Sequence, residues 1–432
     1  MRIYDIIDKK RHGLKLSREE IEFVISSYMK NEIADYQTSA LLMAICINGM
    51  DEEETNDLTR AMVNSGESLD LSSLDNTVDK HSTGGIGDKT TLIVAPIVAS
   101  LGCTVAKMSG RGLGFTGGTV DKLESIDGFK TELSPSDFFE QAKECGIVVV
   151  GQSANLAPAD KKLYALRDVT ATIESIPLIA SSIMSKKIAS GAKSIVLDVK
   201  VGSGAFMKDV NSARALAEAM IKIGKSFGRN VTCILSDMNV PLGLCVGNSV
   251  EIWEAIEVLS GRGEKRLGEL CLTVSASMVS SALGVSYGEA RLMVENSIKS
   301  GSALAKFYEW IEKQGGDVSK IKDKGSLLSA KHKKQIIAQS SGYIDSLDAQ
   351  KIGAASMSLG AGRVKKADHI DHLAGIILNK TYGDYVEMGE VVATMYASRE
   401  ELFNSASEIF NDAISVSQES PKEKDLIYEI IK

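Results

Sequence analysis

Two short stretches combine glycines with hydroxyl and cationic side chains, a composition suited to binding an oxyanion. The first, residues 109–118, reads SGRGLGFTGG and holds five glycines in ten positions. Glycine permits backbone conformations with positive φ and close approach to a ligand, and successive N–H groups in such a loop form a concave anion site. Hydroxyl donors and a positive charge come from Ser109, Arg111, Thr116 and Thr119. We therefore expect this loop to bind phosphate or a similar anion.

The second stretch, residues 80–91, reads KHSTGGIGDKTT. A β-prone run at 77–80 leads into its glycines, and an apolar segment at 89–101, ended by Gly102, predicts a helix behind them. Phosphate binds well at such a strand–turn–helix junction, because free N–H groups and the positive helix end point the same way. Another β-prone run at 103–108 leads into the first loop. We expect the two turns to share one anion site.

Three other interpretations of these glycines fit the residues less well. Residues 112–117 match the dinucleotide fingerprint, but side chains crowd the turn and no second strand with an acidic end follows at the expected distance. Residues 84–90 resemble a P-loop, yet Asp88 interrupts the Gly-Lys-Thr run that ATP binding requires. Plain tight turns would not require Lys80 and His81 beside the glycines. A shared anion site therefore remains the favoured interpretation.

A third stretch carries polar groups on a helix. Ser182 and Lys186 are four residues apart, so they share one helix face. A solvated face is the alternative, but the apolar neighbours Ile183 and Met184 indicate a partly buried helix. Arg167 precedes this helix in the chain. Together an arginine, a serine and a lysine can donate hydrogen bonds to the carbonyl edge of a flat heterocycle.

The periodicity of the chain predicts an α/β fold with helical and β-rich parts. Residues 1–65 are expected to form helices, one of them opened by a capping box of Ser17 and Glu20. After a polar linker at 66–75, strands alternate with helices over 77–151, which implies a parallel sheet.

The second half of the chain continues this pattern before changing character. Residues 157–192 are expected to be helical, and residues 195–200 to form a buried strand. Short strands with glycine turns follow at 336–398, and we expect a helical tail to close the chain.

Composition narrows the class of protein. A chain of 432 residues is too long for one core, so two or three domains are expected. The net charge of −8 and the lack of basic runs argue against a nucleic-acid partner. The six cysteines show no CxxC pair, as in a reducing compartment. With a charged N-terminus and no uncharged stretch of membrane-spanning length, we expect a cytoplasmic protein without a membrane partner.

The β-rich part offers two weak cofactor patterns. Residues 368–372 read DHIDH, but no third convergent ligand follows nearby, so a polar surface turn is preferred to a metal site. A biotin or lipoyl carrier needs a lysine at a hairpin tip; Lys365 and Lys366 are candidates, but a solvated turn is the preferred interpretation. No organic cofactor is expected.

Taken together, the three stretches resemble a known family. Residues 109–124, the KHSTGG segment at 80–85, and the YALRD and IMSKK segments at 164–168 and 183–187 are similar to the motifs of the thymidine and pyrimidine-nucleoside phosphorylases. The motifs occur in the family's order, and the resemblance runs along the whole chain. Phosphoribosyltransferases of the anthranilate type share a looser version of the fold.

The resemblance implies a two-domain architecture. A small all-helical domain would comprise residues 1–65 with 162–193, and a large mixed α/β domain would comprise 77–155 with 195–432. Within the large domain, about 336–432 would be a β-rich C-terminal module. The pyrimidine would bind the small domain and phosphate the large one, across a cleft that closes. The resemblance also implies a homodimer built through the helical domains.

Residue roles follow from the resemblance position by position. The implied phosphate-binding residues are Lys80, His81, Ser82, Thr91, Lys107, Met108, Ser109 and Thr119. The implied pyrimidine ligands are Arg167, Ser182 and Lys186, with apolar walls from Leu113, Tyr164, Ile179 and Phe206. His81, Arg167 and Lys186 are the implied catalytic residues. Inorganic phosphate would be the co-substrate.

Lys107 bears on the choice of nucleoside. The resemblance implies lysine there in broad-specificity members and methionine in thymidine-restricted ones, and this chain has lysine. The expected reaction is the reversible phosphorolysis of uridine, thymidine and deoxyuridine to the free base and (deoxy)ribose 1-phosphate. A thymidine-restricted phosphorylase is the alternative.

Two positions depart from the pattern of the family. Phe115 stands where relatives commonly have histidine. Lys89 stands where broad-specificity relatives commonly have threonine beside a potassium ion, whose positions here would be Gly87, Lys89, Leu242, Cys245 and Glu254. Carbonyl oxygens could still hold K⁺, or the Lys89 ammonium could pair with Glu254 and replace it; both alternatives stay open.

Two rival functions keep the same fold. A binding or signalling protein with weakened catalysis would be consistent with Phe115, but the retained cations and hydroxyls oppose it. A phosphoribosyltransferase would need sites for pyrophosphate and Mg²⁺, and no convincing acidic pair lies beside the phosphate loops in sequence.

Overall fold

The computed structural model describes residues 1–112, 117–153, 155–363, 365 and 368–432. Leu113, Phe115, Thr116 and Lys366, which the sequence analysis singled out, lie outside the described residues. Among the described residues, no single helix is both long and apolar enough to cross a membrane, although the bent pair 265–283 and 287–299 passes on length and composition taken together.

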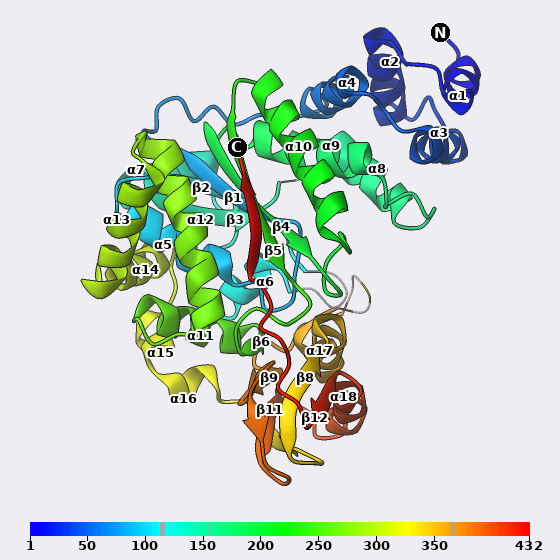
Figure 1. Cartoon of the computed structure of the whole chain (residues 1–432). Helices are drawn as coiled ribbons and strands as arrows, with labels where there is room; N and C mark the ends of the chain where they lie inside the picture. The colour runs from blue at the N-terminus through cyan, green and yellow to red at the C-terminus, as the bar shows by residue number, and fades with distance from the viewer. Residues whose placement is uncertain (113–116, 154, 364, 366–367) are drawn as a thin grey trace.

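The N-terminal helices form a separate lobe, at the upper right of Figure 1. Its core packs Ile6, Leu41 and Met62 against Leu163 and Leu178 from later in the chain. The predicted capping box is confirmed, with the Ser17 side chain accepting from Glu20 N and the Glu20 carboxylate accepting from Ser17 N. The lobe contains α1 (Ile3–Arg11), α2 (Arg18–Met29), α3 (Asp35–Asn48), α4 (Glu52–Val63) and α8 (Pro158–Arg167).

The large part of the molecule is built on a four-stranded sheet of order β1-β4-β5-β13. The strands β1 (Val78–Ser82), β4 (Ser194–Val201) and β5 (Asn230–Asp237) are parallel, as expected, whereas β13 (Ile427–Ile431) is antiparallel to β5. A second parallel pair, β2 (Val105–Ser109) and β3 (Ile147–Gly151), continues from β1 through a bridge between Thr77 and Thr104.

Helices cover both faces of this sheet. Alternate residues of a strand point to opposite faces, and in β4 Ile195 and Leu197 pack toward α9 and α10 while Val196 packs toward α5 and α12. Every residue of α5 is buried, which explains why its sequence is apolar on all sides. These helices are α5 (Thr90–Ala99), α9 (Ile176–Ala189), α10 (Val210–Ser226) and α12 (Lys265–Leu283).

Because β1 and β2 run in the same direction, the two glycine-rich turns leave the sheet at one edge. After the glycine turn at 83–89, named here the first glycine turn, the chain enters α5. After the turn at 110–118, named the second glycine turn, it enters the short helix α6 (Thr119–Glu124). The rest of this part is helical apart from β6 (Cys245–Gly247), and comprises α7 (Pro135–Cys145), α11 (Ser249–Leu259), α13 (Tyr287–Lys299), α14 (Ser302–Lys313), α15 (Val318–Lys322) and α16 (Lys324–Leu327).

Residues 332–417, here named the C-terminal module, hang below the large sheet in Figure 1. One antiparallel sheet has the order β6-β9-β11-β7, and another has the order β10-β8-β12. The elements are β7 (His332–Ile337), β8 (Gly342–Leu347), α17 (Ala349–Ser356), the π-helical turn η1 (Met357–Ala361), β9 (Gly375–Leu378), β10 (Tyr385–Val386), β11 (Val391–Ala397), α18 (Leu402–Asn411) and β12 (Ile414–Ser417).

The predicted helical tail is only partly right. After α18 the chain forms β12 and then β13, and β13 returns to the central sheet rather than staying in the module. The run IYEII at 427–431 is rich in β-branched and aromatic residues, which favours a strand once β5 offers an open edge. Strand β6, from the large domain, in turn joins the module's sheet.

Candidate active site

A cavity of about 400 Å³ lies between the sheet edge and the helical lobe. It brings together every described residue that the sequence analysis assigned to phosphate or base binding. These residues are Lys80, His81, Ser82, Thr91, Lys107, Met108, Ser109, Thr119, Tyr164, Arg167, Ile179, Ser182, Lys186 and Phe206. The glycine turns and strand ends line one side, and α8 and α9 line the other.

Asp88 orients the lysine of the first glycine turn. Lys80 Nζ lies 3.4 Å from Asp88 Oδ1 and hydrogen-bonds Thr90 Oγ1, which donates to the same carboxylate at 2.5 Å. Burial opposes ionisation of Asp88, but the nearby Lys80 and Lys200 ammonium groups outweigh it and hold its pKa well below the usual range. Asp88 is therefore charged, and it holds Lys80 at the end of β1.

Asp79, which the sequence analysis missed, pairs with two lysines beneath the cavity. Its carboxylate lies 3.0 Å from Lys107 Nζ and 2.6 Å from Lys187 Nζ. Burial opposes ionisation, but the two ammonium groups hold the Asp79 pKa well below its usual range. Burial lowers the pKa of Lys107 to about 8, against the attraction of Asp79. A carboxylate in the buried strand VDKHS was the only sequence signal for this group.

His81 points its imidazole into a positively charged environment. Although part of its surface faces the cavity, burial and the nearby Lys187, Lys107 and Lys186 hold its pKa well below the usual value. The imidazole is therefore neutral at pH 7. A neutral imidazole has one N–H donor and one acceptor nitrogen.

The predicted pair on α9 lies on one helix face. Lys186 Nζ donates to Ser182 Oγ at 3.0 Å and to Asp160 Oδ2 at 2.5 Å. Asp160, on α8, was missed by the sequence analysis because no local pattern links it to α9. It holds the ammonium at the wall of the cavity, where Lys186 remains 21% exposed.

Arg167 is held by backbone carbonyls. Its guanidinium donates to Thr172 O at 3.0 Å, Ile173 O at 2.8 Å and Leu178 O at 3.1 Å. Burial lowers its pKa, and the side chain is only 2% exposed. A guanidinium has five N–H donors, so donors remain for a ligand in the cavity that it lines.

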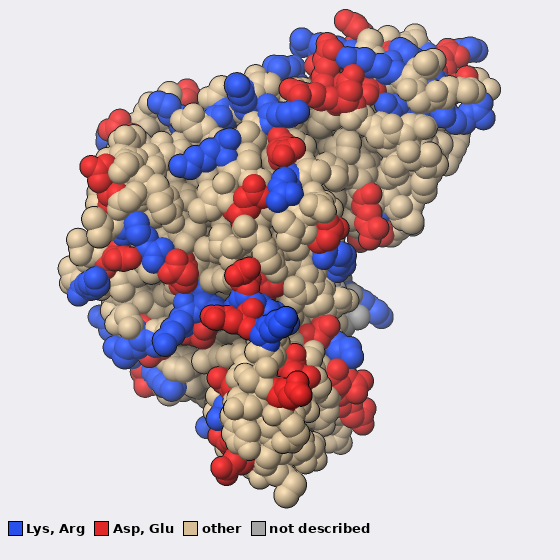
Figure 2. Space-filling model, in the orientation of Figure 1, with Lys and Arg blue, Asp and Glu red and all other residues tan. Residues whose placement is uncertain are grey.

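A wider opening of about 1180 Å³ adjoins this cavity. Met108, Ser109, Tyr164 and Phe206 line both, so the two spaces are continuous. Tyr164 is 38% exposed and Phe206 is 50% exposed, which leaves room for their rings to cover a ligand. Figure 2 shows the molecular outline notched between the helical lobe and the C-terminal module.

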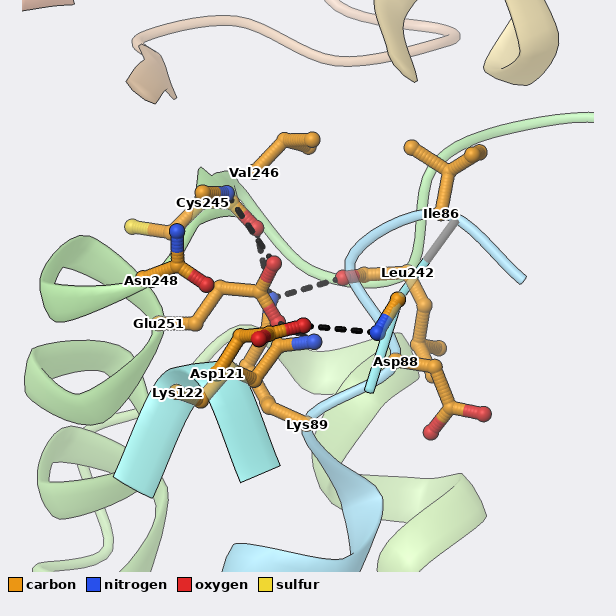
Figure 3. Close-up of polar contacts among 12 residues, drawn as sticks. Ile86, Asp88, Lys89, Asp121, Lys122, Leu242, Cys245, Val246, Asn248 and Glu251 are labelled. Atoms are coloured by element: carbon orange, nitrogen blue, oxygen red, sulfur yellow. Dashed lines mark hydrogen bonds and ion pairs between the residues drawn. The ribbon is translucent and has the colours of Figure 1, made fainter. Parts of the chain in front are cut away.

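Lys89 occupies a buried cage beside α5. Its ammonium donates to Leu242 O at 2.9 Å and Cys245 O at 2.8 Å (Figure 3). It also pairs with the Glu254 carboxylate. Burial opposes the charge, but Glu254 outweighs it and raises the Lys89 pKa. Gly87 lies against this cage, where a Cβ would meet Leu242 O at 2.5 Å. The five residues expected around a cation are thus together, with the ammonium at their centre.

Models of three domain families match consecutive parts of the chain. Residues 4–66 match the glycosyl transferase family helical bundle domain, and residues 74–304 match the glycosyl transferase family a/b domain. Residues 343–417 match the pyrimidine nucleoside phosphorylase C-terminal domain. A pyrimidine-nucleoside phosphorylase of Geobacillus stearothermophilus is 52% identical over 433 residues, covering 100% of both chains. The chain belongs to the pyrimidine-nucleoside phosphorylase family.

Other relatives and one solved structure agree with this family. Pyrimidine-nucleoside phosphorylases of Staphylococcus epidermidis and Staphylococcus haemolyticus are 53% and 56% identical, covering 100% and 93% of each chain. The protein is an enzyme of the pentosyltransferase class. Anthranilate phosphoribosyltransferase from Thermus thermophilus shares the fold alone, with 19% identity and a TM-score of 0.57 over 71% of this chain and 98% of that one.

Proposed function

We propose that this enzyme catalyses the reversible phosphorolysis of uridine, thymidine and deoxyuridine to the free base and (deoxy)ribose 1-phosphate. The observation that carries the proposal is the single cavity with two chemically different sides. One side has the cations, hydroxyls and glycine N–H groups of the two turns, which suit phosphate. The other has Arg167, Ser182 and Lys186, which suit the carbonyl edge of a pyrimidine.

The chemistry follows from this arrangement. Phosphate attacks C1′ while the bond from C1′ to N1 of the base breaks, and the electron pair of that bond leaves with the base. Negative charge develops on the pyrimidine, where the donors of Arg167 and Lys186 are already oriented by carbonyls and Asp160. Preorganised donors of this kind stabilise a transition state because they need not reorganise. Closure of the cavity would exclude water and favour phosphate over water as nucleophile.

His81 enters this scheme as a neutral imidazole that can donate one hydrogen bond to the leaving base. Its low pKa means that it is not a preformed acid at pH 7. A bound phosphate dianion would raise that pKa by placing negative charge among the lysines. Transfer of a proton from His81 to the base therefore depends on phosphate being bound.

The pairing of the carboxylates beside the phosphate-binding turns favours phosphorolysis over a phosphoribosyltransferase reaction. Asp79 and Asp88 are each paired with lysines. Binding Mg²⁺ with pyrophosphate requires carboxylate oxygens that are free to coordinate the metal. The lysine at position 107 supports the broad substrate range, with thymidine-restricted activity as the alternative.

The experiment is to incubate the purified protein with uridine or thymidine, with and without inorganic phosphate, and to follow the free base by absorbance. We expect phosphate-dependent release from both nucleosides. Release from thymidine alone would contradict the broad range but keep the reaction. Release that requires pyrophosphate and Mg²⁺, or binding of nucleoside and phosphate without turnover, would contradict phosphorolysis.

We also propose that the enzyme forms a homodimer and is located in the cytoplasm. Tyr36, Met43 and Ile47 form an exposed apolar stripe on α3, and Tyr4 is exposed on the adjoining α1. We propose that this face forms the homodimer interface, because exposed apolar groups gathered on one face are typical of an association surface. None of the six cysteines, all within the described part of the chain, forms a disulfide, which supports a cytoplasmic location.

The cage around Lys89 bears on whether this enzyme binds a potassium ion. The Lys89 ammonium already donates to two carbonyl oxygens and pairs with a carboxylate, and these are the oxygen ligands that a hard cation would use. We propose that Lys89 takes the place of K⁺ in this enzyme, and that inorganic phosphate is the only accessory molecule that the reaction requires.

A further inference from the structure

Arg363, from the C-terminal module, reaches the second glycine turn. Its Nη1 lies 2.9 Å from Asp121 Oδ1 and donates to Gly112 O at 3.3 Å. The other oxygen of the same carboxylate, Asp121 Oδ2, accepts from Gly112 N at 2.6 Å. The Arg363 side chain is 14% exposed and that of Asp121 is 1% exposed. One ion pair therefore holds both backbone polar groups of Gly112.

Fixing Gly112 also fixes the far limb of the turn. At Gly118 an added Cβ would meet Gly112 N at 2.1 Å, so the two limbs lie backbone against backbone. Gly118 is the residue immediately before α6, and Thr119 begins that helix. Gly112, Gly118 and Thr119 all line the cavity. A displaced Gly112 would therefore displace groups on both limbs that face the anion.

The same contacts neutralise an acidic group beside an anion site. Asp121 is buried and close to the turn, so without a cation it would repel phosphate. Arg363 supplies that cation, and Arg111 lies 3.6 Å from Asp121 while its Nη2 donates to Glu124 Oε1 at 2.6 Å. Asp121 itself lies on α6, among the polar groups drawn in Figure 3.

We propose that Arg363 is a positioning residue that, with Asp121, holds Gly112 and Gly118 of the second glycine turn in the geometry that binds phosphate. The proposal rests on the proposed phosphorolysis and makes the C-terminal module part of the phosphate site. Arg363 acts through Gly112 rather than on the reacting atoms. Its loss should therefore weaken the binding of phosphate more than the binding of nucleoside.

The test compares the wild type with Arg363→Gln, Asp121→Asn and the double variant. KM for phosphate is measured at saturating uridine, and KM for uridine at saturating phosphate. We expect Arg363→Gln to raise KM for phosphate about tenfold, because the buried Asp121 carboxylate keeps, among the described residues, only the more distant Arg111 as a cation and Gly112 O loses its donor. We expect KM for uridine to rise less than about twofold. The double variant should lose less than the product of the two single effects, because the residues act as one pair.

Two further arginine variants control for nonspecific effects and for misfolding. Arg399→Gln removes an exposed arginine of the same module, whose side chain is 66% exposed, and should leave both KM values unchanged. If Arg363→Gln does not fold, Arg363→Lys is measured by the same criterion, since it retains the charge but not the planar fork of donors. An unchanged KM for phosphate, equal increases in both KM values, or multiplicative single effects would overturn the proposal.

Calorimetric titration with inorganic phosphate separates this inference from the proposed function. If the wild type binds phosphate but releases no base, the proposed function fails while the positioning role is still measured. We expect Arg363→Gln to bind phosphate about tenfold more weakly than the wild type and than Arg399→Gln. Equal affinities would overturn the positioning role, whatever the turnover.

Discussion

At the scale of single residues, the charge balance around Asp79 determines how the cavity presents positive charge. One carboxylate faces Lys107 and Lys187, and three lysines surround His81. Removing either cation leaves the carboxylate paired with the other. The site is therefore built so that one positive charge remains in excess, which is what an anionic co-substrate requires.

Lys107→Met tests this excess charge. Because the Lys107 pKa is about 8, its ammonium is charged below pH 8 and is lost as the pH rises through that value. We expect KM for phosphate in the wild type to rise above pH 8, and the variant to have a KM about tenfold higher at pH 7, equivalent to ~1.4 kcal/mol. The variant should lack the rise in KM for phosphate that loss of the Lys107 charge causes above pH 8 in the wild type.

The measurement is KM for phosphate from about pH 6 to 9.5 in both proteins, a range that brackets the Lys107 titration. At each pH, the ratio of the variant's KM to the wild-type KM cancels the effect of the titration of phosphate itself. Lys299→Met, which changes an exposed lysine on α13, should keep the wild-type profile. A ratio that does not change with pH would contradict a role for the Lys107 charge.

At the scale of elements, Lys89 joins the start of α5 to two neighbouring segments that lie much later in the chain. It lies immediately before α5, and its ammonium contacts the backbone before β6 and the Glu254 carboxylate on α11. The raised Lys89 pKa means that its stabilising contribution is present below pH 10.5 and is lost only as the pH rises through the higher folded value. The charge is thus permanent across the working range.

We expect the wild-type rate to be the same in KCl, NaCl and choline chloride at equal ionic strength. Lys89→Met should lower the free energy of unfolding by about 3 kcal/mol, because the buried Glu254 carboxylate loses its cationic partner and is left with the backbone N–H groups of Leu244 and Cys245. Urea unfolding measures this change. The exposed pair Lys222–Glu52 provides the control: Lys222→Met should cost less than about 1 kcal/mol. A rate that falls in choline would support a bound K⁺ instead.

At the scale of the whole molecule, the base side of the cavity is built on two helices that belong to different hydrophobic cores. The helix α8 packs with the N-terminal helices, whereas α9 packs against β4 of the four-stranded sheet that also contains β1. The connecting segments pass each other closely, since a Cβ at Gly66 would meet Asn155 O at 2.1 Å, and Glu67 N donates to that oxygen. Movement of the helical lobe relative to the sheet would therefore have to accommodate this close contact.

The exposed stripe of α3 allows the proposed dimer to be tested. Ile47 is 74% exposed on the apolar stripe of α3. Ile47→Lys places a charge where two copies would meet, and we expect a dimeric wild type to become monomeric in light scattering after size exclusion. Leu292→Lys changes an exposed leucine, 62% exposed on α13, and should leave the mass unchanged. A dimer that survives Ile47→Lys would place the interface elsewhere.

Local features were accessible from the sequence. The strand–turn–helix junction was predicted over 77–101 and is observed as β1 and α5, with the helix slightly shorter than expected. The face shared by Ser182 and Lys186 followed from the helical period, and their hydrogen bond agrees with it. These features depend on residues close in sequence, so composition and spacing determine them. The resemblance to the family's motifs also predicted residues that line the cavity.

The rest depended on contacts between distant segments. Asp160 meets Lys186 across two helices, Arg363 meets Gly112 from the other end of the chain, and β13 returns to β5 from the C-terminus. No spacing rule predicts such contacts, because they arise only when the whole chain packs. The sequence alone determined that the chain has two glycine turns with hydroxyl and cationic side chains, and a polar helix face. Only the tertiary structure decided which carboxylates hold those cations, because a buried charge takes whichever partner the completed fold places beside it.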